Sequence, residues 1–469
     1  MGSRRYPGRR HVKGWQLTAL VGVAGAVVLA GCSSSGTSAG GGSTSTSTAA
    51  PTTNGASKAP GNATSGSISW SASPLTGSGA NDARTVLINA FEKQYPGIKV
   101  TLISASTDTD TNRATLATQI SGGSSSPDVF MGDVIWPAQF GAHQLALPLS
   151  DYLPASYWTR FAAGLVGGAS YKGKVYGSPL FEDQGFMYYR KDLLAAAHMT
   201  PPTTWEQLET EAKTLASSGK VKYGFVWQGD SYEGLTCNFM EYLASAGGTA
   251  TNSAFTQATL NSAAATRAVT FMRSLITSGA SPAAVTTFQE PQAMNTFGAG
   301  NAAFLRNWDY AYTAAITPSS GGKLTAAQVG VEPMPTFQGQ PTPGYSNIGG
   351  WNMYINPHSK NVAADLTFIK WLSTPAAQDI LSKRYGFIST VQAVRTDPTV
   401  IASNPVFAVV PKTKLVPRPA GTPNYPALST AIYQNVNAAL AGSASPSAAV
   451  SSMQNAAKSA LSSTSTGGL

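Results

Sequence analysis

The sequence predicts an α/β fold with a largely parallel sheet, divided between two lobes. At the start of the folded part, a short apolar strand at 68–70 is followed by a helical pattern and then by a second strand. This strand–helix–strand order is typical of parallel sheets covered by helices. About 400 residues follow position 67, more than a single hydrophobic core usually organises, so we expect two lobes.

The first helix is expected directly after Asn81, a residue type that suits the N-cap position. Between 87 and 95, large apolar residues recur at four-residue spacing, and Pro-Gly at 96–97 ends the pattern. Residues 98–102 then alternate between apolar and polar side chains, which predicts the next strand.

The apolar run at 128–133 predicts a buried strand that ends in an acid. In open α/β sheets, ligands bind just beyond the carboxyl ends of the strands. Asp133 and Trp136 are therefore candidate ligand-binding residues. Other patterns predict a helix at about 110–120, a hairpin at 171–177, and helices beginning at 203 or 204 and covering 263–277, 362–372 and 427–440.

The N-terminus reads as an export signal. Five basic residues precede an apolar stretch at 17–30, which is too short to span a bilayer comfortably as a helix. It ends in Leu29-Ala30-Gly31-Cys32, the pattern that precedes a lipid-modified cysteine. We predict a lipoprotein signal peptide at 1–31 and lipidation of Cys32, which places the protein on the extracellular face of the cytoplasmic membrane. A short retained membrane anchor is the alternative, and the Arg pairs leave Sec and twin-arginine export both open.

Composition limits the remaining function classes. Residues 32–67 are rich in Ser, Thr and Gly, so we predict a disordered tether, with a frayed tail at 462–469. The formal charge of +9 includes the five basic leader residues, which leaves +4 for the chain from Cys32 onward and no basic run for nucleic acid. Cys237 is then the single free cysteine, expected to be buried rather than disulfide-bonded.

Catalytic machinery is not evident. The histidines at positions 143, 198 and 358 lie in no metal-ligand spacing and pair with no obvious nucleophile, and no dinucleotide fingerprint occurs. We therefore expect neither a cofactor nor a metal. A pair of carboxylates can hydrolyse a glycoside, which keeps a secreted glycoside hydrolase as an alternative. The candidate carboxylates are Asp133, Glu182, Asp183 and Glu233.

Aromatic residues repeatedly stand next to hydrogen-bonding groups, in what read as loops beside strands. These pairs are Asp133 with Trp136, Phe181 with Asp183, Tyr232 with Glu233, Asn307 with Trp308, Gly349 with Trp351, and Arg418 with Tyr425. A sugar ring packs its C–H face on an aromatic ring and offers its hydroxyls to carboxylate, amide and guanidinium groups. Core packing explains any one aromatic residue better, but the set favours a sugar-binding site.

Several stretches also match a known family. They include Tyr-Arg-Lys-Asp-Leu-Leu at 189–194, Gly-Asn-Ala-Ala-Phe at 300–304, Gly-Phe-Val-Trp-Gln-Gly at 224–229 with Tyr-Glu-Gly-Leu at 232–235, and Arg-Pro at 418–419. Residues 68–456 resemble the extracellular solute-binding proteins (family 1) of carbohydrate ABC importers, and most closely the trehalose/maltose-binding lipoproteins.

The resemblance implies a periplasmic-binding-protein-like fold of type II, in which two α/β lobes enclose a ligand cleft and three chain crossings form a hinge. The implied hinge segments lie at 179–182, 346–350 and 387–391. The implied lobes comprise residues 68–180 and 350–390 for the N-terminal lobe, and residues 181–349 and 391–461 for the C-terminal lobe.

The resemblance also assigns roles to residues. By position, Asp133 and Asp183 would accept hydrogen bonds from sugar hydroxyls, and Arg418 would donate to them. Trp308 and Trp351 would stack on the sugar rings. The remaining implied ligand-binding positions are Gly349, which offers backbone; Phe181, which stands where relatives have Tyr; and Asn81 and Asn112, which stand where relatives have an acid and an Arg.

The function expected from these observations is capture of a disaccharide or short oligosaccharide of the trehalose or maltose type. The protein would be a monomer, deliver the sugar to the transmembrane subunits of an ABC permease, and have no catalytic activity. Two alternatives stay open at this point: the lipid-anchored glycoside hydrolase, and a sugar-sensing lipoprotein that serves no transporter.

Overall fold

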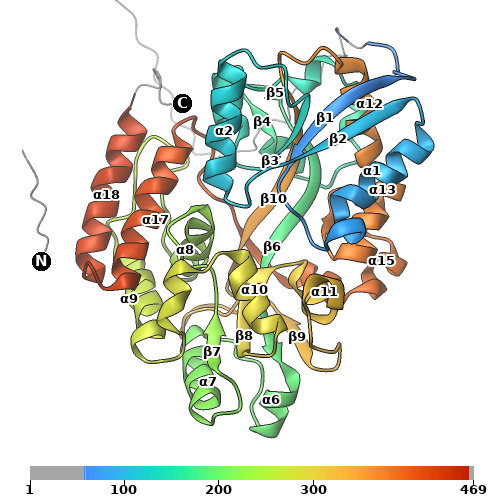
Figure 1. The fold of residues 1–469 in the computed structure, drawn as a ribbon. Helices are drawn as coiled ribbons and strands as arrows, with labels where there is room; N and C mark the ends of the chain where they lie inside the picture. The colour runs from blue at the N-terminus through green and yellow to red at the C-terminus, as the bar shows by residue number, and fades with distance from the viewer. Residues whose placement is uncertain (1–57, 59, 464–469) are drawn as a thin grey trace, which may run out of the picture. The chain divides into compact units, whose positions relative to one another are not determined.

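The computed structural model describes residue 58 and residues 60–463 (Figure 1). Its strands are β1 (Gly66–Ala72), β2 (Ile98–Ser104), β3 (Val129–Asp133), β4 (Ser170–Tyr171), β5 (Lys174–Val175), β6 (Ser178–Arg190), β7 (Tyr223–Val226), β8 (Ala302–Trp308), β9 (Val329–Glu332), β10 (Tyr345–Ile355), β11 (Ile388–Ser389) and β12 (Lys414–Val416). The main sheet runs in the order β2-β1-β3-β10-β6-β8-β7.

Helices connect many of these strands along the chain. They are α1 (Ala83–Gln94), α2 (Thr109–Ser121), α3 (Pro137–Ala142), α4 (Ala155–Trp158), α5 (Leu165–Gly168), α6 (Lys191–Ala196), α7 (Trp205–Ser217), α8 (Glu233–Ser245), α9 (Ala263–Thr277), α10 (Glu290–Gly298), α11 (Ala311–Ile316), α12 (Val362–Leu372), α13 (Pro375–Asp379), α14 (Gln392–Arg395), α15 (Pro398–Ser403), α16 (Pro405–Val409), α17 (Tyr425–Ala441) and α18 (Pro446–Ser462).

The opening strand–helix–strand unit is confirmed, because β1 pairs in parallel with β2 and α1 connects them. The expected N-cap of α1 is wrong by one residue. Asp82 caps the helix, with its carboxylate accepting from the backbone N–H of Arg84 at 2.9 Å. Asn81 instead ends a short 3₁₀ turn. An aspartate and an asparagine side by side offer the same capping chemistry, so the pattern alone does not choose between them.

The expectation of a largely parallel sheet is wrong for its centre. β1 is parallel to β2 and β3, and β7 is parallel to β8. β10, however, runs antiparallel to both β3 and β6, and β6 runs antiparallel to β8. The sheet is therefore mixed, since its two central strands do not belong to simple strand–helix–strand repeats.

β6 and β10 are the two long strands that join the halves of the sheet (Figure 1). The first residues of β6 pair with β10 and β11, whereas its last residues pair with β8 and β9. β10 likewise pairs with β12 at its start and with β3 at its end. Each strand thus changes partners midway, so the two halves of the sheet share a continuous backbone.

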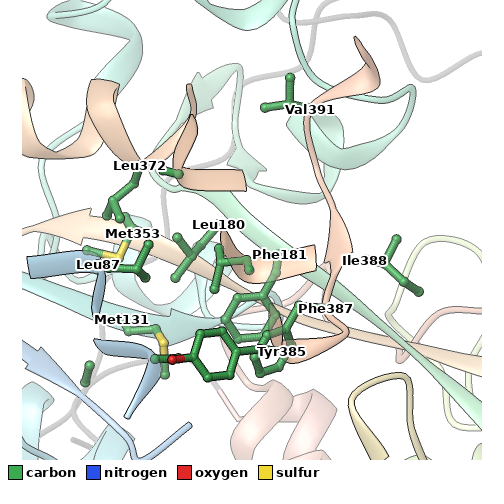
Figure 2. Packing of buried hydrophobic residues seen from close by; sticks show 14 of the residues in the cluster. Leu87, Met131, Leu180, Phe181, Met353, Leu372, Tyr385, Phe387, Ile388 and Val391 are labelled. Atoms are coloured by element: carbon green, nitrogen blue, oxygen red, sulfur yellow. The ribbon is translucent and has the colours of Figure 1, made fainter. Parts of the chain in front are cut away.

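Aromatic side chains fill the core on both sides of this junction. In the first half, Phe91 of α1 meets Phe368 of α12 at a ring-centroid distance of 4.9 Å and Trp371 at 5.5 Å. In the second half, Trp205 of α7 lies 4.2 Å from Tyr242 of α8. Between them, Figure 2 shows the rings of Phe181 and Phe387 side by side; their centroids are 4.3 Å apart. Burial of such rings gives the junction a packed interior.

Several predictions fall outside the described residues. These are the signal peptide at 1–31, Cys32, most of the 32–67 segment, and the tail from 464 onward. Within the described residues, Ser462 is the last residue of α18 rather than part of a frayed end. In the described part of the chain, no helix is both long enough and apolar enough to cross a bilayer.

Candidate functional site

The registers of three adjacent strands bring the predicted residues together. In the β3–β10 pair, Asp133 lies opposite Trp351. In the β10–β6 pair, Trp351 lies opposite Phe181, and Gly349 lies opposite Asp183. Positions that are 166 to 218 residues apart in the chain therefore become neighbours on one sheet.

A cavity of about 400 Å³ opens beside these strands. Its volume falls in the range typical of small-molecule sites, about 300–1,000 Å³. The sequence-predicted residues that line it are Asp133, Phe181, Asp183, Tyr232, Glu233, Trp308, Gly349, Trp351 and Arg418. Both halves of the sheet contribute to its wall.

Trp308 is held rigidly at the cavity wall. Its indole N–H donates to Glu290 Oε1 at 3.2 Å, and Tyr232 donates to the other oxygen of the same carboxylate at 2.7 Å. Behind the ring, the Arg306 guanidinium lies 4.0 Å from the ring centroid. Arg306 is itself fixed by Glu241, with contacts of 2.6 and 2.9 Å. The ring is thus preorganised as an apolar platform.

Arg418 links two acids across the cavity. Its two terminal nitrogens donate to both oxygens of Asp133, at 2.7 and 3.1 Å, and one of them also reaches Glu233 at 2.9 Å. Tyr425 and Ser429 donate to the same Glu233 carboxylate. Burial raises the pKa of Glu233 even though the Arg418 charge opposes that effect. A buried charge cluster of this kind is costly to break from either side.

Gly349 allows the Asp183 side chain and the Trp308 ring to approach the backbone of β10 closely. A Cβ atom at this position would come within 3.2 Å of both Asp183 Cβ and the Trp308 ring. The side chain of Asp183 is buried, and burial raises its pKa to about 7. Its Oδ1 atom is buried and accepts no hydrogen bond from the described residues, although the residue itself lines the cavity. A buried carboxyl oxygen without a donor is uncommon in folded proteins.

Three predicted ligand-binding residues lie outside the cavity. Trp136 is packed in the core, stacked on Phe140 at 5.0 Å, and supports Trp351 edge-on from behind. Asn112 is buried and donates to Ser73 Oγ at 3.3 Å. Asn81 lines a separate small hollow of about 110 Å³, where Arg384 donates to it at 2.6 Å. Trp136 was predicted to bind ligand because it lies close to Asp133 in sequence. In the structure its ring packs in the core and does not line the cavity.

Other residues at the cavity escaped the sequence argument. Glu290 orients Trp308 and Tyr232, yet it lies at the start of α10, where an acid is common for helix-capping reasons alone. The 73–78 segment, Met131, Tyr310 and the Ser319-Ser320 pair also line the wall. The predicted burial of Cys237 is confirmed, and this residue touches the same cavity. No sequence pattern marked this second group as functional.

The wall can hold a neutral, hydroxyl-rich molecule. Two indole rings offer apolar surface, and carboxylate and guanidinium groups line the same cavity. Among residues 60–463, no group of three His, Cys, Asp or Glu side chains is arranged to bind a metal ion.

Comparison with known proteins identifies the family. Residues 77–379 match the sequence model of the bacterial extracellular solute-binding proteins. The chain belongs to this family. As a solute-binding protein it is not an enzyme, and the glycoside hydrolase alternative is set aside.

Relatives of this solute-binding protein agree with that assignment. A probable ABC transporter-binding protein of Deinococcus radiodurans is 31% identical over 368 residues, which cover 76% of this chain and 86% of the relative. The maltose-bound structure of MalE3 from T. maritima has 30% identity and a TM-score of 0.76, and the match covers 84% of this chain and 99% of that one. A tagatose-bound solute-binding protein from Thermotoga lettingae, 21% identical, matches with a TM-score of 0.75 over 85% of this chain and 100% of that one. The predicted fold class is confirmed.

Proposed function

We propose that this solute-binding protein captures a disaccharide or short oligosaccharide, of the maltose or trehalose type, in the cavity beside Trp308. It delivers the sugar to the transmembrane subunits of an ABC permease, which then import it. The single observation that carries the proposal is that Trp308 and Trp351 line the same cavity as Asp133, Asp183 and Arg418.

The chemistry of these groups supports a sugar. A pyranose presents a C–H face and a rim of hydroxyls, and the two indoles can pack against the face. Asp183 contributes a carboxyl group and Arg418 a guanidinium group to the wall of the same cavity, and both can hydrogen-bond to hydroxyls. The MalE3 structure, with 30% identity, is described as maltose-bound, which favours an α-linked disaccharide.

Closure of two lobes supplies the proposed mechanism. In the division proposed above, Asp133 belongs to the N-terminal lobe, and Glu233 and Arg418 to the C-terminal lobe. The contact between Arg418 and Asp133 therefore forms only when the lobes approach, whereas Arg418 and Glu233 belong to the same lobe. The sugar binds one lobe, closure recruits the groups of the other, and the permease recognises the closed form. The bends occur where β6 and β10 change partners and beside β11.

Calorimetry with a panel of sugars tests the proposal. The purified protein is titrated with glucose, mannitol, maltose, trehalose and maltotriose. We expect saturable binding of maltose or trehalose that is at least about tenfold tighter than that of glucose, because a second ring buries a second apolar face. Absence of binding across the whole panel would contradict the proposal.

A matched pair of tryptophan variants locates the site. Trp308→Ala removes the platform, and we expect affinity to fall by roughly 10- to 100-fold. Trp371→Ala removes an equally buried tryptophan of α12, whose indole donates to Gln94 on the far side of the first half. This control lowers stability and leaves affinity unchanged. Equal losses of affinity in the two variants would place the site elsewhere.

We also propose that Cys32 carries a lipid that holds the protein on the outer face of the cytoplasmic membrane as a monomer. The leader sequence that ends at Leu29-Ala30-Gly31 supports this. Metabolic labelling with a radioactive fatty acid should mark the wild-type protein and not Cys32→Ala, which should appear in the medium. Equal labelling of both would overturn the assignment.

A further inference from the structure

Asp309 lies directly behind Asp183, at the end of β8. Its side chain has no solvent exposure. One of its oxygens, Oδ2, accepts the backbone N–H of Ile388 at 2.6 Å, at the start of β11. The carboxyl groups of Asp309 and Asp183 face each other within hydrogen-bonding reach. Asp309 therefore connects a wall residue of the cavity to the third chain crossing.

The two carboxyl groups cannot both be ionised and still bond to each other. An ionised carboxylate only accepts hydrogen bonds, so a bond between two of them requires one proton. Neither Oδ1 atom has a donor among the described residues. A proton shared between these two groups gives both Oδ1 atoms a partner, whereas two bare carboxylates would leave both Oδ1 atoms unsatisfied in the interior.

The surroundings do not neutralise a second negative charge. Asp133, Glu182 and Glu290 face Asp183 and each disfavours its ionisation. The phenols of Tyr188 and Tyr310 lie near the pair. Arg306 is the cation on this side, and its guanidinium is engaged by Glu241. Burial is the largest influence and raises the pKa of both aspartates. Asp183 lines the cavity, whereas Asp309 has no solvent exposure, so the negative charge is less costly on Asp183 and the proton is assigned to Asp309.

We propose that Asp309 is a carboxylic acid that stays protonated at neutral pH, donates a hydrogen bond to the Asp183 carboxylate and thereby holds Asp183 as a hydrogen-bond acceptor for the ligand. Asp309 is a positioning residue, since it lies behind Asp183 and does not line the cavity. The role of Asp183 as a ligand acceptor rests on the proposed function, whereas the shared proton does not. Because Asp309 also holds Ile388, this acceptor is positioned by the crossing itself.

Infrared spectroscopy of the ligand-free full chain tests the proton directly. At about pH 8, acids whose pKa lies near 7, including Asp110 and Asp365, are mostly ionised. We expect one remaining carboxylic-acid carbonyl band that Asp309→Asn removes and Asp365→Asn does not. A spectrum that Asp309→Asn leaves unchanged would overturn the proposal. This arm needs no sugar, so it decides the proton even if the proposed function fails.

Affinity across pH tests the positioning role. The probe is maltose, or the panel sugar that binds most tightly. Asn at 309 keeps one donor toward Asp183 and one acceptor for Ile388, so Asp309→Asn should bind within about threefold of wild type at neutral pH, whereas Asp309→Leu should lose roughly tenfold or more. At alkaline pH wild type should weaken as Asp309 ionises, and Asp309→Asn should not.

Two results would overturn the positioning role of Asp309. One is an Asn variant as weak as the Leu variant. The other is an Asn variant that keeps the alkaline loss of affinity. If Asp309→Leu fails to fold, the Asn variant still decides through its infrared band and its pH profile.

Discussion

Arg418 forms ion pairs with two acids of the site, Asp133 and Glu233, where all three groups are buried. The fold brings these two acids together, and this one guanidinium donates to both. A sugar hydroxyl that enters must either add to these contacts or replace one of them, which makes Arg418 central to both stability and binding.

Removal of Arg418 should therefore destabilise the protein strongly. Arg418→Met keeps a side chain of similar length and leaves the buried acids Asp133 and Glu233 without their cation, so we expect the free energy of unfolding to fall by about 3–5 kcal/mol at neutral pH. The deficit should shrink as pH falls, because protonation removes the unpaired charges. Urea unfolding at two pH values measures this. Lys383→Met, which breaks an exposed pair with Asp379, should cost less than about 1 kcal/mol. A pH-independent deficit would contradict the explanation.

Single residues were predictable from sequence only in part. Asp133 could be placed because a buried strand visibly ends there. Trp136 and Trp308 could not be told apart, since both stand beside polar groups, yet one packs on Phe140 and the other lines the cavity. Glu290 was missed because its position at a helix start has an ordinary explanation. The direction in which a side chain points depends on strand register, which no local pattern encodes.

At the scale of elements, helices were easier to predict than the central strands. The predicted bounds of α9 and α12 agree with the structure, because capping residues and periodic apolar faces mark them. Segments of β6 and β10 were interpreted as loops. β6 is buried along nearly its whole length, so it shows no alternation, and the two glycines in β10 resemble a turn. Strands that pair on both sides lose the signals used to find them.

The backbone conformation at position 350 explains why β10 contains a glycine there. The φ of Gly350 is +117°, and an added Cβ would lie 2.5 Å from the carbonyl oxygen of Phe181. We expect Gly350→Ala to lower the unfolding free energy by at least about 2 kcal/mol more than Gly339→Ala. Gly339 also has positive φ, at +86°, but an added Cβ there would meet nothing within 4 Å. Thermal unfolding of both variants separates backbone strain from steric contact. Equal losses would show that contact with β6 contributes nothing.

At the scale of the whole molecule, buried acids set the response to pH. Burial raises the pKa of Asp110, Asp183 and Asp365 to about 7. Hydrogen bonds lower the pKa of Asp128 and Asp192. The contribution of these two acids to stability has the opposite pH dependence, and it changes at lower pH. An acid with a raised pKa keeps its proton in the folded state while the unfolded chain has released it. Between about pH 4 and pH 7, the folded protein therefore binds more protons than the unfolded chain, and stability falls as pH rises.

Asp365 provides the cleanest test of this balance, because it lies in α12, away from the cavity. Its carboxyl accepts from Ser359 at 2.6 Å, and its other oxygen has no partner among the described residues. We expect the wild type to lose a few kcal/mol of unfolding free energy between about pH 5 and pH 8, and Asp365→Asn to lose measurably less, because the amide has no proton to release. Urea denaturation across this range measures the slope. Asp397→Asn, whose exposed carboxylate has a lowered pKa through its bonds to Thr399, is the control that should leave the slope unchanged. If the wild type instead gained stability toward pH 8, Asp365 would be ionised in the folded state, and burial would not be the dominant influence on its proton.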